Sequence, residues 1–240
     1  MNQINLHGHI SRQFNEELED IRNRVLAMGG LVEQQVMDAV TALAEGDRDL
    51  AEKVRSSDYR INALEVEIDE ECEQVIARRQ PTAVDLRLLM AMIKTITDLE
   101  RMGDEAERIA EQALRLLEEG SPRSQFHQIQ HMGQLVRAME SRAPLTMPRM
   151  DAEAALAVAR IDAKVDLEYQ GLVRQLITFM MENPRTVSSS LHVCWAARAL
   201  ERIGDHARNI CEYVIYFVKG KDVRHTSIEQ MEKEVLSKES

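Results

Sequence analysis

The chain has 240 residues, of which 44% are hydrophobic and 30% are charged, a balance typical of a globular protein and unlike that of a disordered chain. Its 30 basic and 41 acidic side chains leave a formal net charge of -11. Because a phosphate backbone is bound by a net basic surface, this charge argues against nucleic acid as a partner.

The cysteine spacing and the N-terminal sequence further limit the classes of protein to which the chain can belong. The three cysteines, Cys72, Cys194 and Cys211, form no C-x-x-C pair, so neither a zinc knot nor a disulfide framework is expected. The opening MNQINLHGHISRQFNEELED lacks the apolar core of a signal peptide, and no stretch approaches the roughly 20 apolar residues that span a bilayer. We therefore expect a cytoplasmic protein.

Apolar residues recur at steps of three and four along most of the chain, which is the spacing of one helix face. The first such runs cover residues 14–43, 61–76 and 86–109. No stretch alternates polar and apolar residues for long enough to predict a strand. Turn-forming residues interrupt the pattern at five places: Gly46, Pro81, Gly120 with Pro122, residues 144–148, and Pro184. These breaks predict six long helices.

One segment of the chain occurs twice. LERMGDEAERI at residues 99–109 returns as LERIGDHARNI at residues 200–210, 101 residues later and with seven of eleven positions identical. Such self-similarity indicates the duplication of a supersecondary unit. We predict an all-α fold of two tandem three-helix bundles, six helices in all, related by a pseudo-two-fold axis. The first bundle is expected over residues 1–120, and the second, with a C-terminal tail, over residues 121–240.

Each copy of the repeated motif carries two acidic residues four positions apart, Glu100 with Asp104 and Glu201 with Asp205. Like charges at this spacing destabilise a helix by a few tenths of a kcal/mol, and the intervening glycine costs roughly 1 kcal/mol relative to alanine. A cation shared by the carboxylates would offset both penalties, because carboxylate oxygens are natural ligands of hard metal ions. A solvated acidic helix face explains the same spacing, so the motif alone leaves both interpretations open.

The helix before each motif carries a matching polar pair, Asp58 with Asn62 in the first repeat and Asp162 with Asp166 in the second. Two antiparallel helices that each present such a pair can build a four-oxygen cradle for a metal ion. The sequence lacks the Glu-x-x-His element of ferritin-like di-iron sites, so oxygen activation is not expected. The predicted metal ligands are Asp58, Asn62, Glu100, Asp104, Asp162, Asp166, Glu201 and Asp205.

Other conspicuous residues near the motifs are interpreted as structural. Cys194 and Trp195 are expected to anchor the core. On a helical wheel the first motif presents an acidic stripe of Glu100, Asp104, Glu107 and Glu111, and His206 is expected at the surface because its position lies off this stripe. Arg101 and Arg202, which match between the repeats, either pair with stripe carboxylates or meet a partner.

These motifs resemble the PhoU family, the regulatory accessory proteins of bacterial phosphate-specific transport. The likeness rests on LERIGDHARNI and its diverged first copy, on the D-x-x-x-D helix before it, and on the opening HISRQFNEELEDIRNRVLAMGGLVEQQV. It extends over essentially the whole chain. It implies a pair of three-helix bundles whose doubled E(D)xxxD motif is associated with bound metal ions or metal clusters. Asn62 departs from the acidic pattern of the family.

The departure at Asn62 bears on the relative strength of the two implied sites. The second site has four carboxylates and the first has three, so we expect the second to bind a metal more tightly. Arg208 stands where the first repeat has Glu107 and adds positive charge beside the second site. A charge one turn away on a flexible side chain is expected to matter less than a ligand.

The resemblance also implies a function. Family members are negative regulators of the phosphate-starvation response that link the ATPase subunit of the transporter (PstB) to the membrane sensor histidine kinase (PhoR). We expect a protein that is not an enzyme, binds a divalent or trivalent metal such as Mg, Mn, Zn or Fe, and reaches the membrane only through these partners. A homodimer is also expected, since long helices with apolar stripes can share a face. Two alternatives remain open, a metal-dependent hydrolase and a purely structural helical coupler.

Overall fold

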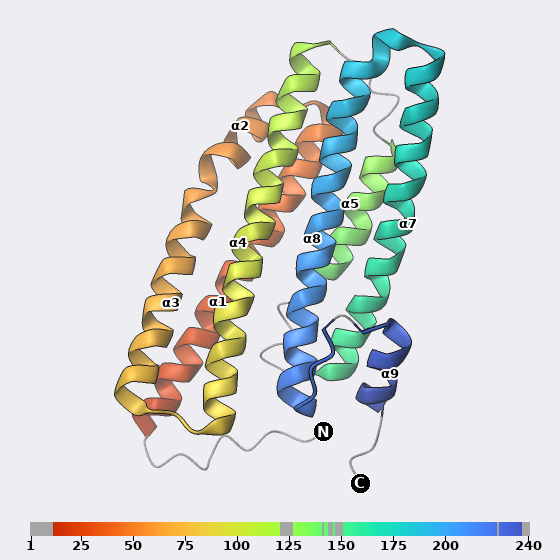
Figure 1. Ribbon diagram of the computed structural model, residues 1–240. Coiled ribbons are helices and arrows are strands. Elements are labelled where there is room, and N and C mark those ends of the chain that lie inside the picture. Colours follow the sequence, from red (N-terminus) through yellow and green to blue (C-terminus); the bar gives the residue numbers. More distant parts are fainter. Residues whose placement is uncertain are drawn as a thin grey trace.

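The structure is a computed structural model in which residues 12–120, 127–140, 142–143, 146, 151–224 and 226–236 are described. Within these ranges the regular structure is helical and no strand occurs, which confirms the all-α prediction. Figure 1 shows the helices as two groups that lie side by side, one from each half of the chain. In the described part of the chain, no helix combines the length and the apolar character that crossing a bilayer requires.

The first group contains four helical segments: α1 (Arg12–Glu45), α2 (Arg48–Ser57), α3 (Tyr59–Arg79) and α4 (Ala83–Glu118). Helix α1 packs against α4, and α2 and α3 follow one another along the same side of this pair. The apolar residues predicted to share a helix face fill the space between them, because side chains three and four apart project from one side. Fully buried members of this core include Ile21, Met28, Ile68, Leu99 and Met102.

The second group repeats this arrangement and adds a short helix at the end of the chain. Its segments are α5 (His127–Glu140), α7 (Ala152–Glu182), the 3-10 turn η3 (Pro184–Thr186), α8 (Val187–Lys219) and α9 (Ile228–Leu236). Helices α5, α7 and α8 pack on one another, and α9 packs mainly on α7. The buried side chains of Met231 and Val235 fix α9 in place.

The helices end where turn chemistry predicts. Gly46 and Gly120 have φ of 66° and 64°, a backbone region that costs glycine nothing and other residues about 1 kcal/mol or more. Gln80 ends α3 in the left-handed conformation directly before Pro81, and Pro184 begins η3. The predicted break at residues 144–148 falls mostly outside the described residues.

One interruption is not predicted by the sequence pattern. The second expected helix is divided at Asp58 into α2 and α3. Just before this point, Ser56 Oγ donates to the Lys53 carbonyl at 3.1 Å and Ser57 Oγ donates to the Val54 carbonyl at 3.0 Å. Serine hydroxyls that bond back to the preceding turn compete for its carbonyls and bend helices. Asp58 therefore lies at a bend beside α4.

Buried polar side chains join the two halves along α4 and α8, whose contact we call the α4–α8 seam. On α4, Asp98, Glu105 and Gln112 are each seven residues apart and lie on one stripe of the helix. Each of the three has a partner across the seam: Asp98 Oδ1 lies 2.7 Å from His206 Nδ1, Glu105 Oε1 lies 2.9 Å from Arg202 Nε, and Gln112 Oε1 lies 2.8 Å from His192 Nδ1.

The seam corrects two of the expectations for single residues. His206 was expected at the surface, but it is 7% exposed and bonded to Asp98 from the other half. Trp195 was expected to anchor the core, but it is 52% exposed. It shares its face of α8 with Val187 and Leu191, which are also exposed, because the neighbouring helices leave this face uncovered. Cys194 does pack against the core.

Candidate metal-binding clusters

In the first half, the repeated motif on α4 lies against the bend between α2 and α3. Gly103 permits this close approach, since a Cβ atom at this position would lie 3.0 Å from Asp58 Oδ1 and 3.2 Å from Ile61 Cδ1. Any larger residue would have to displace the Asp58 carboxylate. The motif glycine thus lets a buried carboxylate approach the helix that carries Glu100 and Asp104.

Asp58 is 7% exposed, and both of its carboxylate oxygens accept hydrogen bonds. Oδ1 accepts from Gln35 Nε2 at 3.2 Å, and Oδ2 accepts from Asn62 Nδ2 at 3.0 Å. Asn62, a predicted ligand, therefore contacts another predicted ligand as a donor. A carboxylate in place of Asn62 would instead repel Asp58 across one helical turn.

Four more acidic side chains share this place with Asp58. The pKa values of Glu100, Asp104 and Glu107 are raised mainly by desolvation, and the charge of Asp58 contributes to all three shifts. Desolvation also raises the pKa of Glu65 on α3, and the charge of Glu65 raises the pKa of Glu100. We call these five residues together with Asn62 the first cluster. A bound cation would relieve the mutual repulsion of its carboxylates.

In the second half, the motif on α8 lies against α7 in the same way. A Cβ atom at Gly204 would lie 3.3 Å from Asp162 Oδ1. Asp162 is 2% exposed and Glu201 is 9% exposed. Desolvation raises the pKa of each to about 6, and the charges of Asp166 and Asp205 contribute to both shifts. We call Asp162, Asp166, Glu201 and Asp205 the second cluster.

The buried carboxylates of the second cluster are only half satisfied. Asp162 Oδ2 accepts from Arg208 Nη1 at 3.2 Å, and Glu201 Oε1 accepts from Arg198 Nη1 at 2.5 Å. The other oxygens, Asp162 Oδ1 and Glu201 Oε2, are buried without a hydrogen-bond partner. A buried charged oxygen without a donor costs on the order of 1–3 kcal/mol or more. This pattern favours a cation at the second cluster.

The donor chemistry of both clusters fits a hard metal ion, since carboxylate and amide oxygens are its preferred ligands. In the ranges that the structure describes, however, no three His, Cys, Asp or Glu side chains form a ready-made metal site. A metal would therefore have to draw side chains at the exposed edge inward, Asp205 among them. Metal binding at both clusters stays a prediction.

Two residues at the first cluster, Glu65 and Gln35, are not predicted from the sequence. Glu65 lies seven residues after Asp58 and so on the same helix face, and a step of three residues from Asn62, the other spacing of a helix face, would have found it. Gln35, which donates to Asp58, belongs to α1. No local pattern links it to a helix that begins more than twenty residues later.

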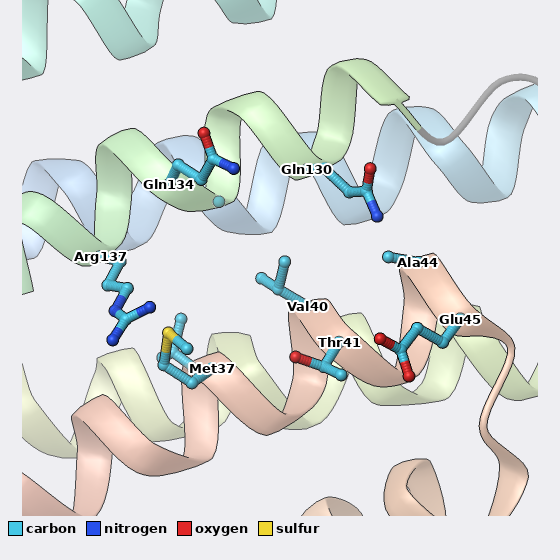
Figure 2. A pocket seen from close by; sticks show the side chains of 10 residues that line it. Met37, Val40, Thr41, Ala44, Glu45, Gln130, Gln134 and Arg137 are labelled. Atoms are coloured by element: carbon cyan, nitrogen blue, oxygen red, sulfur yellow. The ribbon is translucent and has the colours of Figure 1, made fainter.

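A pocket of about 280 Å³ lies between α1 and α5. Figure 2 shows Arg137 near one end and Glu45 near the other, with Val40 between them. None of the eight predicted ligands lines this pocket, and its lining contains one hydroxyl, that of Thr41, and no histidine or cysteine. This pocket is therefore separate from the two predicted metal sites.

These observations define a class: a duplicated helical protein in which each half sets an E-x-x-x-D pair beside a buried aspartate of the neighbouring helix. The PhoU domain matches residues 25–113 and again residues 129–214. One match falls in each half of the chain, while the boundary at residue 120 stays a prediction. The chain belongs to the PhoU family.

Relatives and solved structures agree over most of the chain. It is 53% identical to the phosphate-specific transport system accessory protein PhoU homolog of Pseudomonas putida, covering 98% of this chain and 92% of that protein. It is 46% identical to the Escherichia coli accessory protein PhoU, covering 100% and 99%. The crystal structure of PhoU from Pseudomonas aeruginosa, 52% identical, superposes with a TM-score of 0.85 over 87% of this chain and 100% of that one. The Streptococcus pneumoniae regulatory protein PhoU, 30% identical, gives 0.80 over 88% and 99%.

Proposed function

We propose that this protein is a cytoplasmic adaptor and a negative regulator of the phosphate-starvation response. The observation that carries the proposal is family membership over nearly the whole chain, with relatives named as accessory proteins of phosphate-specific transport. The adaptor links the transporter's ATPase subunit (PstB) to the sensor histidine kinase (PhoR). It holds the kinase in its non-signalling state when phosphate is plentiful. It is not an enzyme, forms a homodimer and meets the membrane only through these partners.

Metal binding at both clusters is part of this proposal. The residues that would hold the ions are Asp58, Asn62, Glu100 and Asp104 in the first cluster, and Asp162, Asp166, Glu201 and Asp205 in the second. A divalent or trivalent ion, Mg, Mn, Zn or Fe, would supply the positive charge that the carboxylates lack. The unpartnered oxygens of Asp162 and Glu201 support this part of the proposal. So do the raised carboxylate pKa values, since they mark desolvated carboxylates that also repel one another and whose charge a cation would offset.

Deleting the gene tests the regulatory role. If the protein restrains the kinase, secreted phosphatase activity in phosphate-rich medium should rise at least several-fold in the deletion strain. A plasmid copy of the wild-type protein should restore repression. Unchanged phosphatase activity in the deletion strain would contradict the proposal.

A companion strain tests the metal component and the hydrolase alternative. The double variant Asp104→Asn, Asp205→Asn should restore repression less well than the wild type at equal protein level. Full restoration by this variant would remove metal binding from the regulatory role. Hydrolysis of phosphate esters by the purified, Mn²⁺-loaded wild type, abolished in the double variant, would favour the hydrolase instead.

A further inference from the structure

Arg208 on α8 is held at the second cluster by three separate acceptors. Its Nη1 donates to Asp162 Oδ2 at 3.2 Å, its Nε donates to Glu212 Oε1 at 3.0 Å, and its Nη2 lies 3.4 Å from the backbone carbonyl of Thr226. The Arg208 side chain is only about a quarter exposed. It therefore occupies one oxygen of the most buried carboxylate of the cluster with a fixed positive charge.

The first cluster has the opposite charge at the equivalent place. With the repeat offset of 101 residues, Glu107 is the counterpart of Arg208 in the first repeat. The pKa of Glu107 is raised by desolvation and by the charges of Asp58 and Asp104, so it adds to the negative charge of its cluster. Replacing a carboxylate by an arginine changes the local charge by two units. The two clusters therefore differ most at this position, although their E-x-x-x-D pairs are identical.

The third acceptor of Arg208 belongs to the segment after α8. Thr226 lies between Val223, which is 1% exposed, and α9, whose Met231 is fully buried. These apolar contacts fix the position of the Thr226 carbonyl beside Arg208. In the first half, the corresponding end of α4 leads into the connection to the second half. The contact between arginine and tail is thus a feature of the second cluster.

We propose that Arg208 is a built-in counter-ion of the second cluster, positioned by the C-terminal segment, and that it makes this cluster the weaker of the two metal sites. This inference rests on the proposed metal binding. The guanidinium is bonded to Asp162 Oδ2, so a metal bound through the unpartnered Oδ1 would share the carboxylate with an intramolecular cation that repels it. Loosening the tail frees Arg208 to turn toward solvent and strengthens metal binding at the second cluster. The ranking expected from ligand counts alone is reversed.

Mn²⁺ titrations, with free Mn²⁺ followed by electron paramagnetic resonance, test the proposal on the full chain. The double substitution Glu100→Gln, Asp104→Asn removes the first site, so that binding to the second cluster is read alone. In this background, Arg208→Gln should tighten Mn²⁺ binding roughly tenfold, because one like charge next to a partly buried site is removed. Arg208→Lys retains the charge and should tighten binding much less.

A second variant tests the role of Arg208 by loosening the C-terminal segment that positions it. Met231→Ala, in the same background, loosens α9 and should tighten Mn²⁺ binding in the same direction as Arg208→Gln but by a smaller factor. Arg12→Gln makes the same change in net charge at an exposed arginine that pairs with Glu16, and serves as the control. Circular dichroism melting of each variant establishes that the chain is folded during the titration.

The outcomes distinguish a failure of the counter-ion role from a failure of the proposed metal binding. If the wild type binds Mn²⁺ but Arg208→Gln leaves the affinity of the second cluster unchanged, the counter-ion role is wrong and metal binding stands. If Arg12→Gln tightens binding as much as Arg208→Gln does, the effect is one of net charge and the role is likewise wrong. If neither the wild type nor any variant binds Mn²⁺, both the inference and the proposed metal binding fail.

Discussion

Gly103 and Gly204 occupy the same place in the two motifs, but their surroundings differ. A Cβ atom at Gly103 would lie 3.0 Å from an Asp58 oxygen that is already bonded to Gln35. At Gly204 the nearest atom is 3.3 Å away, and it is the Asp162 oxygen that has no hydrogen-bond partner. In the first carboxylate the oxygen that faces the glycine is bonded, whereas in the second only the other oxygen, Oδ2, is bonded, to Arg208.

Alanine at the two positions should therefore have different effects on stability. Both substitutions gain roughly 1 kcal/mol of helix propensity. At Gly204 this gain should leave the free energy of unfolding unchanged or slightly increased. At Gly103 the displaced Asp58 should outweigh it, with a net loss of about 1–2 kcal/mol. Urea unfolding of the two variants measures the difference, and a Gly103→Ala variant at least as stable as Gly204→Ala would contradict it.

At the level of helices, the α4–α8 seam places charged groups where most helix pairs place apolar ones. Asp98 is 3% exposed and accepts hydrogen bonds from His206 and from Asn209, at 2.7 and 3.1 Å. Removing one partner of a buried charged pair lowers stability more than replacing both partners by apolar residues, because the remaining charge stays desolvated.

His206→Ala should therefore lower the free energy of unfolding by about 3 kcal/mol. Asp98→Asn in addition should recover part of that loss, since the stranded charge is gone, so the two effects should not add. Arg202→Ala, which removes a half-exposed partner of Glu105, should cost less than His206→Ala. A double-mutant cycle by urea unfolding checks these relations, and strict additivity of the His206 and Asp98 changes would show that the pair is not coupled.

The helices themselves were predictable from sequence because an apolar period of three to four residues needs no knowledge of neighbours. The carboxylate pairs were predictable for the same reason, since each lies within one helix. The sequence could not reveal that two serine hydroxyls bend the helix at Asp58, or that Gln35 donates to it from α1. Nor could a helical wheel show which face another helix covers. His206 and Trp195 were therefore both assigned to the wrong environment.

For the whole molecule, the two clusters together make stability depend on pH. The carboxylates of Asp162 and Glu201 have folded-state pKa values of about 6, against ordinary values of 3.8 and 4.5. The folded state therefore takes up protons before the unfolded state does. The resulting stabilisation is fully present below the ordinary values and is lost as the pH rises through about 6. The raised pKa values of Glu100 and Glu107 act in the same direction.

Chelator-treated protein should accordingly melt at a higher temperature at about pH 6 than at about pH 7.5. Saturating Mn²⁺ should flatten this dependence, because the metal replaces the protons. The variant Asp162→Asn, Glu201→Gln should also reduce it. Scanning calorimetry at matched ionic strength makes the comparison. A lower melting temperature at about pH 6 than at about pH 7.5 would contradict the prediction.

The α4–α8 seam also shows what a duplicated chain can do and a dimer of identical subunits cannot. Across a two-fold axis between identical subunits, each position meets the counterpart set by symmetry, so both sides must carry the same residues. Here the two sides are encoded separately: the position of Glu105 holds His206 in the other half, and that of Asp98 holds Ala199. Fusion into one chain has thus allowed an acidic flank on α4 to face a basic one on α8, a pairing of unlike surfaces within an otherwise symmetric body.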